Sequence, residues 1–317
     1  MGNSMHSMGA IRFALFRLLA AIPTLLLVIA IAFLMVHAAP GGPFDEERRL
    51  PLEIEANIAA AYHLDESLPE QFWRYLSGLA EGDLGPSYRY REYRVAELIG
   101  AAIPVSLALG AIAMLLALLV GVGGGIAAAL AHGSRRDRII SALAMSGISL
   151  PVFVIAPALV LLFAVYLGVL PASWSGADGG VSRYVLPVFA LALPQVAYIT
   201  RLTRASMIEV MNSDFIRTAR AQGLRTASVV RHHALKPAML PLLSYMGPAI
   251  AGILTGSVVV EQIFGIPGLG QLFVRAALNR DYTLVLGSVI FYATLVILLN
   301  LLVDMLYGFL DPRIRQR

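Results

Sequence analysis

Apolar residues gather in six long runs along the chain, and each run is bounded by polar or glycine-containing segments. About 20 apolar residues are enough for a helix to cross a bilayer. Strand-like alternation of apolar and polar positions is absent. Because lipid offers no water to an unpaired backbone, the runs are predicted to be helices. The predicted spans are approximately 18–38, 103–131, 144–167, 185–202, 242–260 and 284–306.

Three of these runs carry features that modify the simple picture. The first precedes a small-residue motif that resembles a signal-peptide cleavage site, but it is too long for a typical signal core and is assigned as a span. The third contains Pro151 and Pro157, which are expected to bend or end the helix. The second contains Gly121 and Gly125, whose spacing of four favours close helix approach.

The segment of about 40–99 is the most polar part of the chain and is too long for a simple turn. Within it, residues 52–64 and 70–80 have the periodicity of short amphipathic helices separated by turn signals. We expect a small helical insertion on the extracytoplasmic side after the first span.

A second polar segment, residues 203–241, is strongly basic and is called the basic loop below. Residues 215–222 contain no helix breaker, Ser213 or Asp214 can cap the start, and Gly223 supplies a stop. Phe215, Thr218, Ala219 and Gln222 are expected to share one face. A helix of roughly 12 Å is too short to be stable alone in water, so it needs packing from a neighbour or partner.

The distribution of charge sets an orientation. With both termini, residues 132–138 and residues 201–236 on one side, that side carries 15 of the 24 basic residues, while the other carries 15 of the 20 acids. Basic excess marks the cytoplasmic side. The sequence therefore predicts six spans with both termini in the cytoplasm, and the basic pI reflects this topology without implying nucleic-acid binding.

Several chemistries are excluded or disfavoured by composition. The chain has no cysteine, and its one lysine, Lys236, lies between Leu235 and Pro237, so it cannot form a phosphate-binding loop. His232 and His233 are adjacent and point about 100° apart on a helix, which disfavours a shared metal. No catalytic, cofactor-binding or metal-binding residues are assigned, and any ATP and Mg²⁺ are expected on partner subunits.

The run Arg217-Thr-Ala-Arg-Ala-Gln-Gly223, followed by Leu235 and Pro237, resembles the cytoplasmic coupling loop of ABC-importer permeases. It departs from the general pattern: Arg217 replaces the usual Glu, Thr218 replaces an Ala, and Lys236 separates the final Leu and Pro. The form DFIRTARAQGL is similar to the peptide-transporter branch. In that family the loop contacts the ATPase, which implies a coupling role for Asp214, Phe215, Arg217, Thr218, Ala219, Ala221, Gly223, Leu235 and Pro237.

The string VVVEQIFGIPGLGQLFVRAALNRDY, whose residues 261–281 are called the glycine-rich segment below, resembles the final outer loop of oligopeptide permeases. The resemblance extends from about residue 12 to 313 and identifies the chain as a B-type permease subunit of the bacterial peptide/nickel importer family. It implies that the glycine-rich segment lies near the pathway or the docked binding protein, through Glu261, Gly265, Pro267, Gly268, Gly270, Asn279, Arg280 and Asp281.

The resemblance also implies a type I permease fold, with residues 1–317 forming a single transmembrane domain in the bacterial inner membrane. Its expected partners are a homologous second permease, two ATP-binding subunits and an extracytoplasmic peptide-binding protein, and its expected substrates are oligopeptides. Dipeptides, cell-wall peptides and nickel chelates remain alternative substrates. An ion-driven secondary transporter, with Glu261 or Asp304 as the coupling carboxylate, remains an alternative mechanism.

Overall fold

The computed structural model describes residues 2–39, 63–90, 92–174 and 180–310. These residues fold almost entirely into helices, and the only strand-like pairing among them is an isolated bridge between Pro86 and Arg94. The all-helical prediction is confirmed.

Among the described residues, five helices are long and apolar enough to cross a membrane. Their mean hydropathy over the best window lies between 1.5 and 2.8, and they correspond to the first, second, fourth, fifth and sixth predicted spans. Prolines inside α7 and α11 do not end these helices. The five are α1 (Gly2–Ala38, apolar from Phe16), α4 (Val95–Leu130), α7 (Ser182–Met211), α11 (Leu240–Phe264) and α13 (Tyr282–Leu310).

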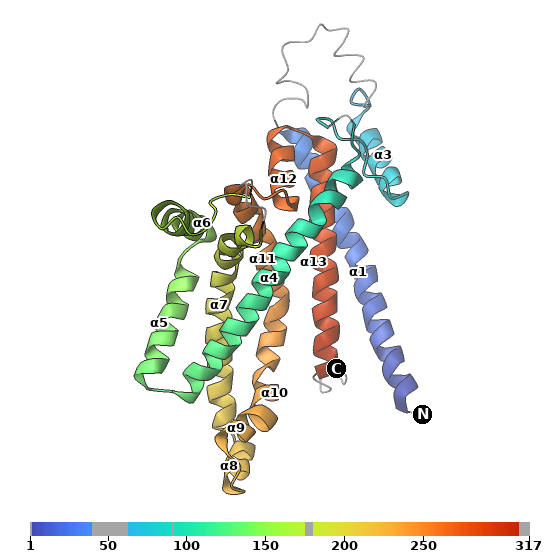
Figure 1. The fold of residues 1–317 in the computed structure, drawn as a ribbon. Coiled ribbons are helices and arrows are strands. Elements are labelled where there is room, and N and C mark those ends of the chain that lie inside the picture. Colours follow the sequence, from blue (N-terminus) through green and yellow to red (C-terminus); the bar gives the residue numbers. More distant parts are fainter. Residues whose placement is uncertain (1, 40–62, 91, 175–179, 311–317) are drawn as a thin grey trace. The chain divides into compact units, whose positions relative to one another are not determined.

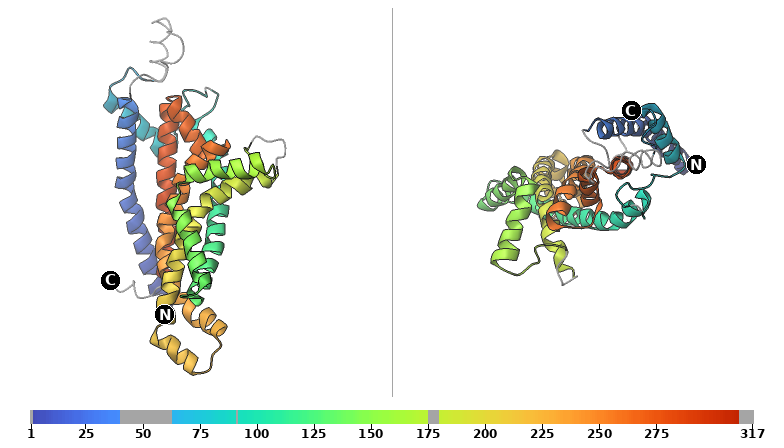
Figure 2. Two further views of the ribbon diagram at one scale, coloured as in Figure 1. Left: turned by 90° about the vertical axis from the view of Figure 1, so that its left-hand side faces the viewer. Right: turned by 90° about the horizontal axis from the view of Figure 1, so that it is seen from above.

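The third predicted span is broken, as Pro151 predicts. Helix α5 (Arg135–Ser149) is followed by α6 (Val152–Leu159) and the π-helical η1 (Val160–Tyr166), with a bend of 105° between them. Figure 2 shows this change of direction in its left view. Leu150 is extended, with φ −98° and ψ 121°, as a residue before proline prefers. With the bent pair counted as one span, the described residues contain six candidate spans.

Two boundaries differ from the prediction because polar first turns extend the helices beyond their apolar runs. Helix α5 begins at Arg135 rather than near 144, since the Ser134 hydroxyl accepts a hydrogen bond of 3.3 Å from the Asp137 amide and caps the helix. Helix α4 begins at Val95, inside the segment predicted as an extracytoplasmic insertion.

The chain divides into two compact units. One contains Ser106–Ile266 with the end of α13, and the other contains Phe16–Val105 with Pro267–Ile297. Three of the boundaries fall inside the helices α1, α4 and α13, and the fourth lies in the turn between α11 and α12. The single-domain assignment stays a prediction.

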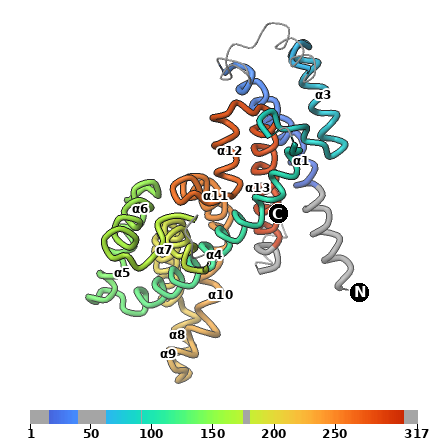
Figure 3. The backbone as a smooth tube through the Cα atoms, turned by 45° about the horizontal axis from the view of Figure 1, so that its top comes forward, coloured from blue at the N-terminus to red at the C-terminus, as the bar shows by residue number. Residues whose placement is uncertain are grey.

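In the first unit, α7 is the central element. It packs against α5 and α11, which lie beside it in Figures 1 and 3. Glycines allow α7 to approach its neighbours closely: a Cβ added at Gly125 of α4 would lie 2.5 Å from the Thr203 Cβ, and one at Gly147 of α5 would lie 2.9 Å from the Ala197 Cβ. The close approach expected from Gly121 and Gly125 is therefore present.

The second unit has its own core. Val95, Ile99 and Ala102 of α4 pack with Leu284 of α13 and with α12 (Leu269–Leu278). Phe33 of α1 meets Phe72 of α3 (Leu68–Ala80), with ring centroids 5.1 Å apart. Helix α3 confirms the second predicted amphipathic helix, whereas the first, residues 52–64, falls almost wholly outside the described residues.

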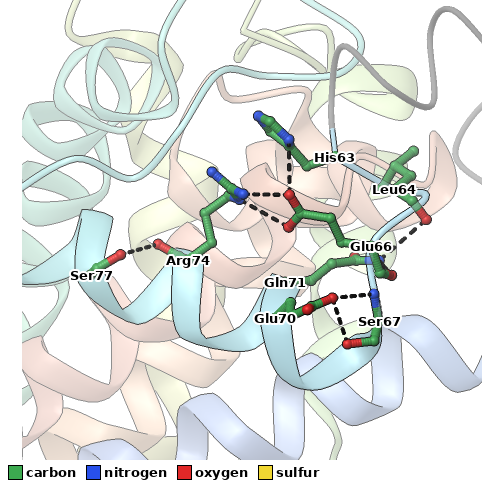
Figure 4. A network of polar contacts seen from close by, with 8 residues as sticks. All are labelled: His63, Leu64, Glu66, Ser67, Glu70, Gln71, Arg74 and Ser77. Atoms are coloured by element: carbon green, nitrogen blue, oxygen red, sulfur yellow. Dashed lines mark hydrogen bonds and ion pairs between the residues drawn. The ribbon is translucent and has the colours of Figure 1, made fainter.

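Polar contacts fix the start of α3 (Figure 4). The Ser67 amide and hydroxyl donate to the Glu70 carboxylate at 3.0 and 2.7 Å. Arg74 donates through Nε to Glu66 at 3.1 Å. This hydrogen bond lowers the pKa of the Glu66 carboxyl, and the two Ser67 hydrogen bonds lower the pKa of Glu70.

Candidate functional site

The basic loop contains the short helix that its sequence predicts. Helix α8 (Asp214–Ala221) has Ser213 at its N-cap position and Gln222 at its C-cap position. Gly223 follows with φ +79°, a conformation that glycine adopts at no steric cost, and its amide donates to the Arg220 carbonyl at 2.9 Å. The predicted start and stop are confirmed, although the Ser213 hydroxyl donates back to the Val210 carbonyl at 2.6 Å.

Helix α8 packs on a face that the sequence analysis did not single out. Ile216 and Ala219 are buried with Met207 of α7 and with residues that follow α8. Phe215, Thr218 and Gln222, which were expected to share a face with Ala219, are exposed. The spacing of apolar residues alone does not tell which of two overlapping faces packs. On the face that is buried, Ile216 is larger than Ala219.

The exposed face of α8 therefore carries most of the predicted contact residues. Asp214, Phe215, Arg217, Thr218, Ala221 and Gly223 are exposed, and Phe215 retains 51% of its accessible surface. Arg217 pairs with Asp214 at 3.2 Å, an exposed contact that adds little stability. Ala219 is the exception, because at 5% exposure it is a packing residue of this chain.

The rest of the basic loop returns the chain to α11. It consists of α9 (Thr226–Val229), the π-helical η2 (Val230–Ala234) and α10 (Leu235–Ala238). Val229, Ala234 and Ala238 are fully buried and pack beneath α8, whereas Leu235 and Pro237 are half-buried. Figure 1 shows α8 and α9 beyond the ends of α7 and α10, so α8 is presented at the tip of a packed base.

A buried ion pair, which sequence reasoning missed, lies close to this base. The Arg204 guanidinium of α7 donates through Nε to Asp137 Oδ1 at 2.5 Å and through Nη2 to Asp137 Oδ2 at 2.8 Å. The Gly133 amide donates to the same carboxylate at 3.0 Å, and Asp137 is 3% exposed. This bidentate contact ties the turn between α4 and α5 to α7. Its partners are 67 residues apart, so no local pattern announces it.

The glycine-rich segment forms a turn between helices, as predicted. Helix α11 ends at Phe264, and Gly265 follows with φ +66°. Gly268 is the N-cap residue of α12, and Asn279 is its C-cap residue. Gly265 and Pro267 are exposed, Gly268 and Gly270 are buried, and Asn279 and Arg280 are half-buried.

The two acidic residues predicted in this segment are buried within the chain. Glu261 is 0% exposed, and its carboxylate accepts a hydrogen bond of 2.7 Å from Ser106 Oγ of α4. Asp281 is also 0% exposed and caps α13 by accepting from the Leu284 amide at 3.2 Å. Asp281 also accepts from the amides of Tyr88 and Arg89, each at 3.2 Å. Both acids therefore serve the packing of this chain and are not surface contacts here.

No cluster of three or more His, Asp or Glu residues that could hold a metal ion occurs in the described part of the chain. Its distinctive features are the membrane-crossing helices, a turn rich in glycine, and a short basic helix with one buried and one exposed face.

These features define a polytopic transport permease, and the family is shown directly. Residues 121–316 match the family model of the binding-protein-dependent transport system inner membrane component, and residues 10–109 match the N-terminal model of such components. The chain belongs to this family and is a multi-pass inner membrane protein.

Two relatives and one solved structure show which proteins of known name or structure this chain is similar to. The chain is 52% identical over 306 residues to the oligopeptide transport system permease protein OppB of Salmonella typhimurium, covering 96% of this chain and 99% of that protein. It is 39% identical over 305 residues to the dipeptide transport system permease protein DppB of Bacillus subtilis, covering 96% and 98%. Its fold is similar to a chain of the inward-facing MetNI methionine ABC transporter, with TM-score 0.55, 17% identity and coverage of 68% and 96%.

Proposed function

We propose that this chain is the pore-forming subunit of an ATP-driven ABC importer that takes up oligopeptides. The observation that carries the proposal is the 52% identity with a named oligopeptide permease along nearly the whole chain. The dipeptide relative is 39% identical over a similar length, which favours the longer substrates.

The geometry of α8 supports a coupling role. A helix of eight residues transmits force only if one face is anchored, and Ile216 and Ala219 anchor it against Met207 of α7. The exposed part of the helix surface offers Phe215 and Arg217 to a partner. In this proposal α8 sits on an ATP-binding subunit, and closure of the ATPases moves α8 and the ends of α7 and α10 as one body, switching the pathway between its two sides.

The remaining partners follow from the same proposal. A homologous second permease completes the pathway, two ATP-binding subunits hold ATP and Mg²⁺, and an extracytoplasmic binding protein delivers the peptide. The chain itself performs no catalysis. Both termini and the basic loop are cytoplasmic, because that side then carries the excess of arginine.

The glycine-rich segment has a narrower role than its sequence implies. The exposed Gly265 and Pro267 and the half-buried Asn279 and Arg280 are the members available to a partner, while Glu261 and Asp281 hold neighbouring helices. We infer that the binding protein or peptide meets the first set only.

The test is ATP hydrolysis by the complete complex in lipid vesicles, with its binding protein and a panel of ligands. The panel contains dipeptides, peptides of three to six residues, a cell-wall peptide and a nickel chelate. Stimulation by the longer peptides is expected. Stimulation only by another ligand would change the substrate and keep the importer class. Peptide uptake that needs an ion gradient and survives ATP depletion would instead support the secondary-transporter alternative.

A further inference from the structure

A stripe of polar side chains crosses the contact between α7 and α11, two helices that are otherwise largely apolar at this level. On α7 it comprises Gln195, Tyr198 and Arg201, spaced three residues apart so that neighbours lie on adjoining turns of one side. On α11 it comprises Tyr245, with Gly252 two turns away on the same face. Polar groups inside membrane helices almost always face other helices or a water-filled path.

The stripe is held together by two contacts. The Tyr245 hydroxyl donates to Gln195 Oε1 at 2.8 Å, and the Tyr198 and Tyr245 rings stack with centroids 4.0 Å apart. Gly252 leaves room for the amide, because a Cβ there would lie 2.9 Å from Gln195 Nε2. The side chains are therefore positioned rather than free to reorient.

Most hydrogen-bond donors of the stripe remain unused. Within the described part of the chain, no acceptor pairs with Gln195 Nε2 or with the Tyr198 hydroxyl. Arg201 has no acidic partner there and only lies over the Tyr198 ring, 5.3 Å from its centroid. Gln195, Tyr198 and Tyr245 are half-buried and Arg201 is exposed, so the donors are accessible from one side.

The ligand that these donors fit is an extended peptide. It offers a carbonyl acceptor at every residue and a carboxylate at its end. The carbonyls match the donors of the Gln195 amide and the Tyr198 hydroxyl, and the carboxylate matches the Arg201 guanidinium. The stacked tyrosine rings supply flat apolar surface that discriminates little between side chains.

We propose that Gln195, Tyr198, Arg201 and Tyr245 line the peptide path, with Arg201 binding the terminal carboxylate. This inference rests on the proposed import of peptides and adds the residues that contact them. Arg201 lies nearest to the basic loop, so it meets the peptide close to the proposed cytoplasmic side.

The absence of cysteine from the chain allows a direct test of accessibility. In the complete reconstituted importer, Gln195→Cys and Tyr198→Cys are treated with a membrane-impermeant thiol reagent, and the label on this chain is measured by intact mass. We expect labelling that a transported peptide reduces several-fold. Phe189→Cys on the same helix is the control. Phe189 is an apolar residue with 46% exposure that we expect to face lipid, where an impermeant reagent should leave it unlabelled.

The role of Arg201 is tested with pairs of peptides that differ only in a free or amidated C-terminus. The same binding protein is used throughout, so its own preference cancels when the uptake ratio is compared between variants. We expect Arg201→Gln to reduce the preference for the free carboxylate by about tenfold, the effect of losing one charge-assisted hydrogen bond, and Arg201→Lys to retain most of it.

Two results would overturn the proposal. One is a Tyr198→Cys chain that is as unreactive as Phe189→Cys, which would place the stripe against lipid or the second permease. The other is an unchanged uptake ratio in Arg201→Gln, as expected if Arg201 binds a lipid phosphate. Because the unsubstituted complex must import peptide in the same assay, failure of the stripe is distinguished from failure of the proposed function.

Discussion

Gly123 and Gly125 of α4 lie two residues apart, yet their surroundings are opposite. A Cβ added at Gly123 would meet nothing within 4 Å. One added at Gly125 would lie 2.5 Å from the Thr203 Cβ and 2.8 Å from the Thr200 carbonyl oxygen of α7. Gly125 therefore sets the distance between two helices, whereas Gly123 only lowers helix propensity.

This contrast predicts different stabilities for two matched substitutions. Gly125→Ala should destabilise the chain by about 1–3 kcal/mol, because the backbone of α7 has to move. Gly123→Ala should be neutral or stabilising by up to about 1 kcal/mol. Thermal unfolding in one detergent measures both, and equal midpoints for the two variants would contradict the assigned contact.

The ionic contacts of α3 predict a pH dependence with a definite sign. The Arg74 hydrogen bond lowers the pKa of Glu66 in the folded state, so the contact stabilises α3 above the ordinary glutamate pKa and is lost as pH falls through the lowered value. The hydrogen-exchange protection of α3, corrected for intrinsic rates, should stay constant from about pH 8 to 5 and decrease below about pH 4.

Arg74→Gln provides the control for that measurement. It removes the charge that lowers the pKa of Glu66, so protection should be lower near neutrality and should change less in acid. Because both side chains are solvent-accessible, a modest change is expected. Loss of protection between pH 8 and 6 would show that another group controls this helix.

At the scale of elements, local sequence signals predicted where helices begin and end, but they did not predict which helices contact one another. The ends of α8 were predicted within one residue: Ser213 occupies the N-cap position without a side-chain cap hydrogen bond, and Gly223 ends the helix with a positive φ. Pro151 likewise predicted the break after α5, since proline acts on the residue before it.

The sequence did not indicate the contacts that depend on residues far apart along the chain. The buried face of α8 depends on Met207 and on residues after Gly223. The ion pair of Asp137 with Arg204 joins α5 to α7, which are separated along the chain by α6 and η1. The burial of Asp281 follows from backbone amides nearly 200 residues away. None of these contacts leaves a periodic or local signal in the sequence.

The two faces of α8 lead to a prediction that separates docking from folding. Phe215→Ala removes an exposed ring and should weaken ATPase attachment and peptide uptake with little change in stability. Ile216→Ala creates a cavity in the packed base and should destabilise the chain by about 2–4 kcal/mol. Co-purification of the ATPase subunits and thermal unfolding measure the two effects. Equal loss of stability in both variants would argue against an exposed docking face.

At the scale of the whole molecule, the charge distribution and the spans together predict a single orientation. If the bent pair crosses once, the described helices make an even number of crossings, and we then expect the two termini on the same side. The basic loop follows α7, the fourth crossing, and α3 follows α1, the first. An odd number of crossings then separates them, so we expect α3 and the basic loop on opposite sides of the membrane.

Cysteine substitutions at two exposed positions test this orientation. Ser77→Cys on α3 should react with an impermeant thiol reagent in intact spheroplasts, and Thr226→Cys at the start of α9 should react only in inverted vesicles. Reaction of both from the same side would mean that the bent pair of α5 with α6 and η1 enters and leaves on one side. The chain would then cross five times, its termini would be separated, and the arginine-rich loop could not face the ATPases while α3 faced the binding protein. The labelling pattern therefore decides at once whether the 105° bend interrupts a crossing or reverses it.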